Sequence, residues 1–284
     1  MQVEQRTLNT AAHPFQITAY WLDQISDFET AVDYPIMIIC PGGGFTYHSG
    51  REEAPIATRM MAAGMHTVVL NYQLIVGDQS VYPWALQQLG ATIDWITTQA
   101  SAHHVDCQRI ILAGFSAGGH VVATYNGVAT QPELRTRYHL DHYQGQHAAI
   151  ILGYPVIDLT AGFPTTSAAR NQITTDARLW AAQRLVTPAS KPAFVWQTAT
   201  DESVPPINSL KYVQAMLQHQ VATAYHLFGS GIHGLALANH VTQKPGKDKY
   251  LNDQAAIWPQ LALRWLQEQG LLAGNYLEHH HHHH

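Results

Sequence analysis

Short apolar runs alternate along the chain with segments whose apolar residues recur at helical spacing. Short runs rich in β-branched residues predict buried strands. They occupy residues 15–22, 35–40, 66–72, 109–113, 147–152, 193–197 and 222–228. Helices are predicted at residues 54–63, 84–100, from 117 onward, 207–219 and 254–268. Strands that alternate with helices predict an α/β fold with a mostly parallel sheet flanked by helices.

One long interruption separates two of the predicted strands. Residues 158–190 are too many for an ordinary connection, so we expect a small helical insertion there. In an open α/β sheet, insertions after the carboxyl ends of strands stand over the ligand crevice. The insertion is therefore predicted to cap the site. No repeat or linker divides the chain, so residues 1–276 are expected to form a single domain, and residues 277–284 are interpreted as an expression tag.

Charge is sparse in this sequence. Only 12% of the 284 residues are Asp, Glu, Lys or Arg, and no basic run or stripe occurs, so nucleic-acid binding is not expected. The first 16 residues lack the apolar stretch of a secretory signal, and no run of about 18 apolar residues could span a membrane. Cys40 and Cys107 each stand at the edge of an apolar run. We expect two reduced structural thiols in a cytoplasmic protein.

The strongest motif is a Gly-Phe-Ser-Ala-Gly sequence at residues 114–118. It follows a predicted strand and precedes a predicted helix, which is the context of the nucleophile elbow of α/β hydrolases. Side chains at Gly114 and Gly118 would crowd such a sharp turn. Ser116 is therefore the predicted nucleophile, and a glycine-rich turn without chemistry is the alternative.

A loop of three consecutive glycines follows the predicted strand at residues 35–40. A serine nucleophile needs N–H groups aimed at the developing oxyanion. The backbone amides of Gly43, Gly44 and Ala117 are the predicted donors. Phosphate binding is the alternative for this loop, but the sequence has neither of the glycine patterns that bind phosphate before a helix.

The general base and the acid are expected in loops after the last two predicted strands. His233 lies in a glycine-rich loop, where it could reach the nucleophile as general base. Asp201 would hold the imidazole in one tautomer. The chain order Ser116, Asp201, His233 is that of α/β hydrolases. Asp158 and Glu202 remain alternatives for the acid.

Taken together, the motifs resemble those of bacterial acetyl esterases and short-chain carboxylesterases of the α/β-hydrolase superfamily, in the group around hormone-sensitive lipase and acetylxylan esterases. The resemblance rests on residues 41–45 (PGGGF), 71–74 (NYQL), 82–84 (YPW), 114–120 (GFSAGGH), 201–205 (DESVP) and 233–234 (HG). It implies an α/β-hydrolase fold and hydrolysis of esters with small acyl groups, often acetyl groups on sugars. Many relatives have His where this chain has Pro41, and Arg where it has Gln73. The difference at Pro41 favours the acetylxylan-esterase-like branch of the group.

The substrate pocket is expected to be small and aromatic, because several large rings flank the motifs. The candidates are Phe45, Tyr47, Phe115, Tyr154, Phe163 and Trp180, each with core packing as its alternative. The predicted function is a serine carboxylesterase acting on short-chain esters, acetylated sugars among them, through an acyl-serine and without a cofactor or metal. A peptidase or amidase of the same superfamily, a lipase for longer chains and an inactive binding module remain alternatives. The expected partner is a small-molecule ester, and exposed aromatic residues in the insertion would favour a homo-oligomer.

Overall fold

The computed structural model describes residues 1–10 and 13–273. Within these residues, eight strands form one sheet in the order β1-β2-β4-β3-β5-β6-β7-β8. The strands are β1 (Gln2–Thr10), β2 (His13–Trp21), β3 (Tyr34–Cys40), β4 (His66–Asn71), β5 (Val105–Phe115), β6 (Ala149–Gly153), β7 (Ala193–Thr198) and β8 (Thr223–Phe228). Strands β3 to β8 are parallel, whereas β2 is antiparallel to β1 and β4. The prediction of a mostly parallel sheet is confirmed. Residues 277–284, which we interpret as an expression tag, lie outside the described residues.

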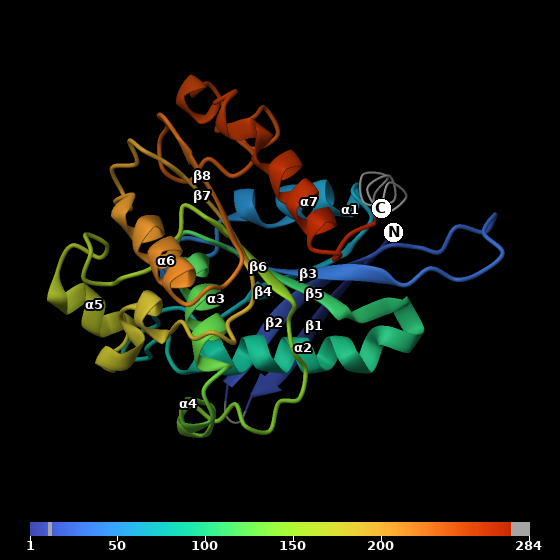
Figure 1. The fold of residues 1–284 in the computed structure, drawn as a ribbon, viewed down its shortest axis with the longest axis horizontal. Helices are drawn as coiled ribbons and strands as arrows, with labels where there is room; N and C mark the ends of the chain where they lie inside the picture. The colour runs from blue at the N-terminus through green and yellow to red at the C-terminus, as the bar shows by residue number, and fades with distance from the viewer. Residues whose placement is uncertain (11–12, 274–284) are drawn as a thin grey trace.

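Helices cover both faces of the sheet. They are α1 (Ala54–Met61), α2 (Trp84–His103), α3 (Ala117–Val128), α4 (Pro132–Arg137), α5 (Ser167–Ile173), α6 (Ile207–Gln218) and α7 (Trp258–Glu268). Short 3-10 helices are formed by Gly50–Glu52, Ala177–Leu179, Ala182–Leu185, Asp248–Tyr250 and Ala255–Ile257. Helices α1 and α7 lie on one face, and α2 and α3 lie on the other (Figure 1). None of the described helices has both the length and the apolarity needed to cross a membrane.

The central strands bury both of their faces, and their side chains alternate between two cores. In β3, Ile36 and Ile38 pack into the core beneath α2, α3 and α6. Met37 and Ile39 pack into the core beneath α1 and α7. A strand buried on both faces needs apolar residues at every position, which explains the continuous apolar run in the sequence. Because β3 to β8 run parallel, their carboxyl ends meet at one end of the sheet.

Strand β1 was not predicted from the sequence. This strand pairs with β2 at the edge of the sheet, and most of its residues are exposed. Glu4 and Arg6 lie within it. Charged side chains on an edge strand discourage pairing with other molecules. A polar edge strand has no apolar alternation, so the pattern that revealed the inner strands was missing here.

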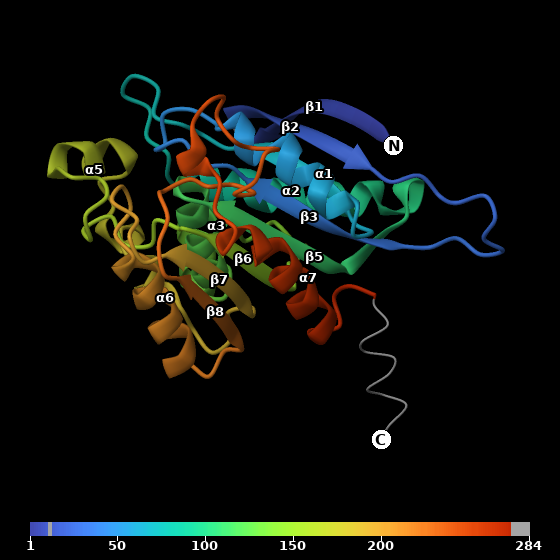
Figure 2. The same cartoon turned by 90° about the horizontal axis from the view of Figure 1, so that it is seen from above.

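Residues 158–190 lie between β6 and β7. They contain α5 and two of the 3-10 helices. Figure 2 shows α5 projecting from the molecule at the end opposite the loop between β2 and β3. That loop precedes β3, so α5 stands at the end of the sheet where the parallel strands finish.

Candidate active site

Ser116 stands at the sharp turn between β5 and α3. Its backbone has a φ of 55° and a ψ of −117°. A non-glycine residue in this region of positive φ costs about 1–3 kcal/mol, and such strain is typical of functional sites. A Cβ added at Gly118 would overlap the carbonyl oxygen of Cys40, and one at Gly114 would overlap that of Gly118. The two glycines of the motif are therefore required by space.

Three loops bring Ser116, His233 and Asp201 together. Oγ of Ser116 lies 2.7 Å from Nε2 of His233. Nδ1 of the same ring lies 2.6 Å from Oδ2 of Asp201. The carboxylate is fully buried, while the imidazole is 20% exposed. This arrangement allows the ring to take a proton from the serine while the buried carboxylate stabilises the resulting positive charge.

The orientation of the Asp201 carboxylate is fixed by three further hydrogen bonds. The backbone N–H groups of Ser203 and Val204 donate to Oδ1, at 3.0 and 2.9 Å. The side-chain amide of Gln197 donates to Oδ2 at 2.9 Å. With both oxygens held, Oδ2 keeps the direction in which it meets His233. Gln197, at the end of β7, is a supporting residue that the sequence patterns did not reveal.

The two alternative acids are placed elsewhere. Asp158 accepts hydrogen bonds from Thr160 and Gln183 and forms an ion pair of 3.1 Å with Lys211. Burial opposes ionisation of Asp158, but these hydrogen bonds outweigh it and lower its pKa to about 2. Glu202 is exposed. Neither carboxylate has a hydrogen bond with the imidazole.

His120 lies on α3, one helical turn after Ser116, and is buried. Its Nδ1 is 2.7 Å from the hydroxyl of Tyr82, and its Nε2 is 3.1 Å from the carbonyl oxygen of Trp180. Burial lowers the pKa of His120 to about 4, which outweighs the hydrogen bond to Trp180. With both ring nitrogens engaged, His120 connects α3 to the insertion and is not available as a base.

The glycine loop after β3 faces Ser116. The backbone N–H of Gly42 is tied to Oε1 of Glu52, at 2.9 Å. By contrast, the amides of Gly43, Gly44 and Ala117 have no hydrogen-bond acceptor within the described part of the chain. Free amides next to a nucleophile can bind a developing oxyanion. The buried Glu52 that holds this loop was not singled out from the sequence, because an acidic residue after a glycine loop carries no motif.

A pocket of about 230 Å³ opens at Ser116. Its lining residues are Gly43, Gly44, Tyr47, Ser49, Arg51, Glu52, Ser116, Phe163, Ser203, Val204, His233, Gly234, Lys244 and Tyr250. Among the expected aromatic residues, Tyr47 and Phe163 therefore line it. Phe163 comes from the insertion and lies 3.7 Å from where a Cβ on Gly44 would stand.

Phe45 and Phe115 do not line this pocket, which corrects the expectation that they bind substrate. Phe115 is the last residue of β5, and its side chain points to the face of the sheet beneath α7. There it packs against Tyr154 and Trp258. Phe45 is fully buried, and its ring meets His120 at 6.1 Å between centroids. Proximity in sequence to a catalytic motif does not decide the direction of a side chain, because alternate strand residues face opposite sides.

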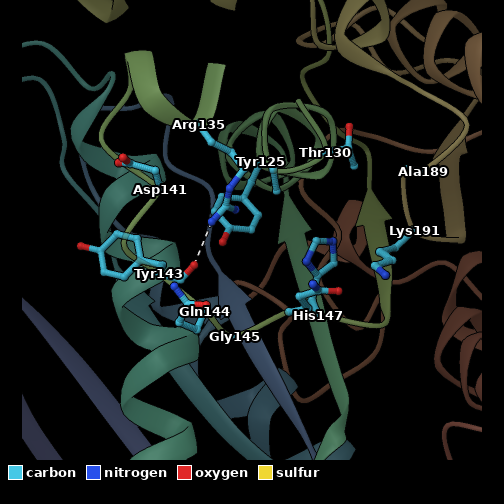
Figure 3. Close-up of a pocket in the computed structure, with 12 residues that line it drawn as sticks. Tyr125, Thr130, Arg135, Asp141, Tyr143, Gln144, Gly145, His147, Ala189 and Lys191 are labelled. Carbon is cyan, nitrogen blue, oxygen red and sulfur yellow. Dashed lines mark hydrogen bonds between the residues drawn. The ribbon is translucent and has the colours of Figure 1, made fainter. Parts of the chain in front are cut away.

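The molecule has larger hollows at the other end of the sheet. One of about 370 Å³ lies beside the end of α3 and the start of β6 and β7, with His147 and Lys191 in its wall (Figure 3). The guanidinium of Arg135 donates there to the carbonyl oxygen of Tyr143 at 2.8 Å. This hollow contains none of the three residues that meet at the elbow. The smaller pocket at Ser116 is the one where Ser116, His233 and the free amides converge.

Metal ligands and paired cysteines are not features of the described residues. No group of three or more His, Cys, Asp or Glu side chains among them could hold a metal ion. Cys40 is buried and Cys107 partly exposed, and both are free thiols. Burial raises the pKa of Cys40 far above its usual value, so this thiol stays protonated.

Comparison with known proteins agrees with the fold. A crystal structure of a Lactobacillus plantarum WCFS1 protein assigned as a carboxylesterase is 96% identical. It covers 96% of this chain and 100% of its own, with a TM-score of 0.88. Endo-1,4-beta-xylanase B of Butyrivibrio fibrisolvens is 28% identical over 72% of this chain and 33% of its own length. Carboxylesterase NlhH of Mycobacterium tuberculosis is 25% identical over 43% of this chain and 37% of its own. The chain thus spans about a third of the length of the curated relatives it matches.

The sheet order, the strand-to-helix turn and the similarity to solved proteins of this fold define a protein of the α/β-hydrolase class. The expected α/β-hydrolase fold and the resemblance to carboxylesterases are thereby confirmed. Within this class, the chain belongs to the BD-FAE family, whose pattern matches residues 22–216.

Proposed function

We propose that this protein hydrolyses short-chain acyl esters, acetyl esters above all, through an acyl-serine intermediate. The observation that carries the proposal is the unbroken hydrogen-bonded chain from Ser116 through His233 to the buried Asp201. It stands beside free backbone amides in a small pocket. That combination supports a nucleophile, a base, an orienting acid and an oxyanion site.

In the first half of the reaction, Oγ of Ser116 attacks the carbonyl carbon of the ester, and its proton moves to Nε2 of His233. The carbonyl oxygen becomes negative and accepts hydrogen bonds from the amides of Gly43, Gly44 and Ala117. The intermediate then collapses, the bond from carbon to the alcohol oxygen breaks, and His233 gives its proton to the departing alcohol. The acyl group remains on Ser116.

Water completes the cycle. His233 takes a proton from the water as its oxygen attacks the acyl carbon. The same amides hold the oxyanion, and the proton returns to Oγ of Ser116 as the acid leaves. Asp201 holds the ring in the tautomer that has its free nitrogen toward the serine. Apart from the ester and water, these steps use only side chains and backbone groups of this chain.

The pocket volume supports a small substrate. Ligand pockets usually measure about 300–1,000 Å³, whereas this one measures about 230 Å³. Tyr47 and Phe163 occupy part of the wall. An acetyl group fits such a space more easily than a long chain does. The alcohol part of the ester is proposed to be a sugar, because one relative is named as a xylanase.

A substrate panel on the parent enzyme and Ser116→Ala tests the proposal. We expect p-nitrophenyl acetate and acetylated xylose to be hydrolysed, and Ser116→Ala to lose at least about a thousandfold in kcat while it keeps its fold. Mass spectrometry should find an organophosphate adduct on Ser116. Faster cleavage of aminoacyl p-nitroanilides would favour a peptidase, and a label on another residue would overturn the assignment of the nucleophile.

A further inference from the structure

Three cationic side chains surround one buried tyrosine at the mouth of the active-site pocket. The guanidinium carbon of Arg51 lies 4.5 Å from the centre of the Tyr250 ring. The ammonium groups of Lys244 and Lys249 lie 5.2 and 5.7 Å from the same centre. Attraction between the cations and the electron-rich face of the ring helps to hold them near each other. A fourth lysine, Lys247, is exposed in the same short segment.

The described acidic residues near these positive charges form no close ion pair with them: Glu202 lines the same hollow as Lys249, and the charge of Arg51 acts on the buried Glu52. None of the ion pairs formed by the described residues includes Arg51, Lys244 or Lys249. Arg51 donates to the carbonyl oxygens of Thr242 and Gly234, which position it without cancelling its charge. The whole chain has a formal net charge of −5. The local positive charge at this opening is therefore opposite in sign to the charge of the protein as a whole.

The phenol of Tyr250 responds to the same positive surroundings. Burial raises its pKa, but a hydrogen bond from Lys244 and the charges of Lys244, Arg51 and Lys249 outweigh burial and lower the pKa. An anion placed beside these groups would be stabilised for the same physical reason.

The cations lie close to the side of the active site from which the alcohol part of the ester would leave. Beside the pocket at Ser116 lies a second hollow of about 520 Å³, and the two share Ser203, His233 and Tyr250. Lys249 lines the second hollow, which lacks Ser116 and the glycine loop. The alcohol must depart toward His233, because this ring protonates it. The second hollow is therefore on the alcohol side of the ester.

We propose that Lys244 and Lys249, gathered around Tyr250, bind a carboxylate carried by the alcohol part of the ester. This inference rests on the proposed esterase function and specifies its substrate class: acetyl esters of hydroxy acids, acidic sugars among them. Lysine attracts a carboxylate as a compact point charge. The cations also raise the rate of encounter with anionic esters, because exposed charges steer ligands of opposite sign.

Two esters that differ in charge on the alcohol side test the proposal. 4-Acetoxybenzoate has a carboxylate on the alcohol part, and methyl 4-acetoxybenzoate is its neutral counterpart. The quantity measured is the ratio of kcat/KM for the anionic ester to that for the neutral one, compared between parent and variants so that intrinsic reactivity cancels. If the parent enzyme cleaves neither ester, the proposed function fails. If it cleaves both, the ratios in the variants decide the further inference.

The double variant Lys244→Met, Lys249→Met should lower this ratio by about fivefold to tenfold. Raising the salt from about 0.02 to 0.2 M should lower the ratio in the parent and have little effect on it in the variant. Lys244→Arg, Lys249→Arg should restore most of the ratio. Lys191→Met, at the opposite end of the sheet, is the matched control. An unchanged ratio in a folded double variant, or an equal fall in the control, would overturn the proposal.

Discussion

The buried phenol of Tyr154 donates a hydrogen bond to the buried carboxyl group of Glu52. The same hydroxyl accepts the backbone N–H of Ala236 at 3.0 Å. Glu52 in turn accepts the N–H of Gly42. This pair therefore joins the glycine loop to the loop that carries His233, whose ring meets that of Tyr154 at 5.1 Å between centroids. Burial raises the pKa of Glu52, and its hydrogen bonds offset this only in part.

Tyr154→Phe should destabilise the protein, because it leaves two buried polar groups without their partner. We expect the free energy of unfolding to fall by about 1–3 kcal/mol, together with a lower kcat, since the two loops lose their connection. Urea unfolding and ester kinetics measure both. Tyr125→Phe is the control: Tyr125 is also buried, but its hydroxyl has no hydrogen bond with a described residue. Equal stability of the two variants would contradict the role of the Tyr154 hydroxyl.

Asp201→Asn should reduce kcat by about 10³–10⁴, because an amide would favour the wrong tautomer of His233. Asp158→Asn should leave kcat nearly unchanged, since Asp158 pairs with Lys211 instead. Steady-state kinetics with p-nitrophenyl acetate separate the two. A large loss in Asp158→Asn with a small loss in Asp201→Asn would assign the acid to the other residue.

The fold and the loops of the site could be predicted where their cause lies within a short stretch of sequence, such as an apolar run or a glycine motif. A continuous apolar run such as that in β3 marks a strand buried on both faces, and the parallel arrangement follows from alternation with helices. The elbow glycines at 114 and 118 are dictated by contacts with neighbouring backbone, so they appear as a motif. The polar edge strand β1 has neither signal and was missed.

What could not be predicted depends on contacts between distant segments. Glu52 and Tyr154 are separated by 102 positions, and no spacing in the sequence relates them. The same holds for Lys249 and His233, which share a hollow only after folding. The direction of Phe115 was misjudged because its neighbour in sequence is the nucleophile, while strand alternation turns its ring into the core.

His147 should make stability depend on pH. Burial first, and then the charge of Lys191, lower its pKa to about 3. In the unfolded chain the pKa is about 6.5, so between these values the unfolded state binds more protons. The stabilising contribution is present above about pH 6.5 and is lost as the pH falls toward the folded value. From pH 7 to 5 this one residue should remove about 2 kcal/mol from the free energy of unfolding.

His147→Gln tests this expectation, because glutamine can still donate to Oδ1 of Asn126, which lies 2.8 Å from Nε2 of the histidine. Between pH 7 and 5, its free energy of unfolding should decrease less than that of the parent. The difference between the two decreases should be about 2 kcal/mol. The exposed His240, changed to Gln, should keep the parent's dependence. Urea unfolding at both pH values measures the difference, and parallel curves for parent and His147→Gln would contradict the prediction.

Acyl-chain preference should be set by the two rings in the pocket wall, Tyr47 and Phe163. We expect kcat/KM to be highest for acetyl, propionyl or butyryl esters and to fall steeply by octanoyl. Each added methylene gains about 1 kcal/mol where a pocket accepts it, so falling values indicate that the walls exclude the chain. Tyr47→Ala and Phe163→Ala should each move the optimum to longer chains, and Phe28→Ala, an exposed ring in the loop between β2 and β3, should not. Measurements with p-nitrophenyl esters of increasing length decide the matter: values that rise through decanoyl in the parent would indicate a lipase-like pocket, and an unmoved optimum in both wall variants would place the limit elsewhere.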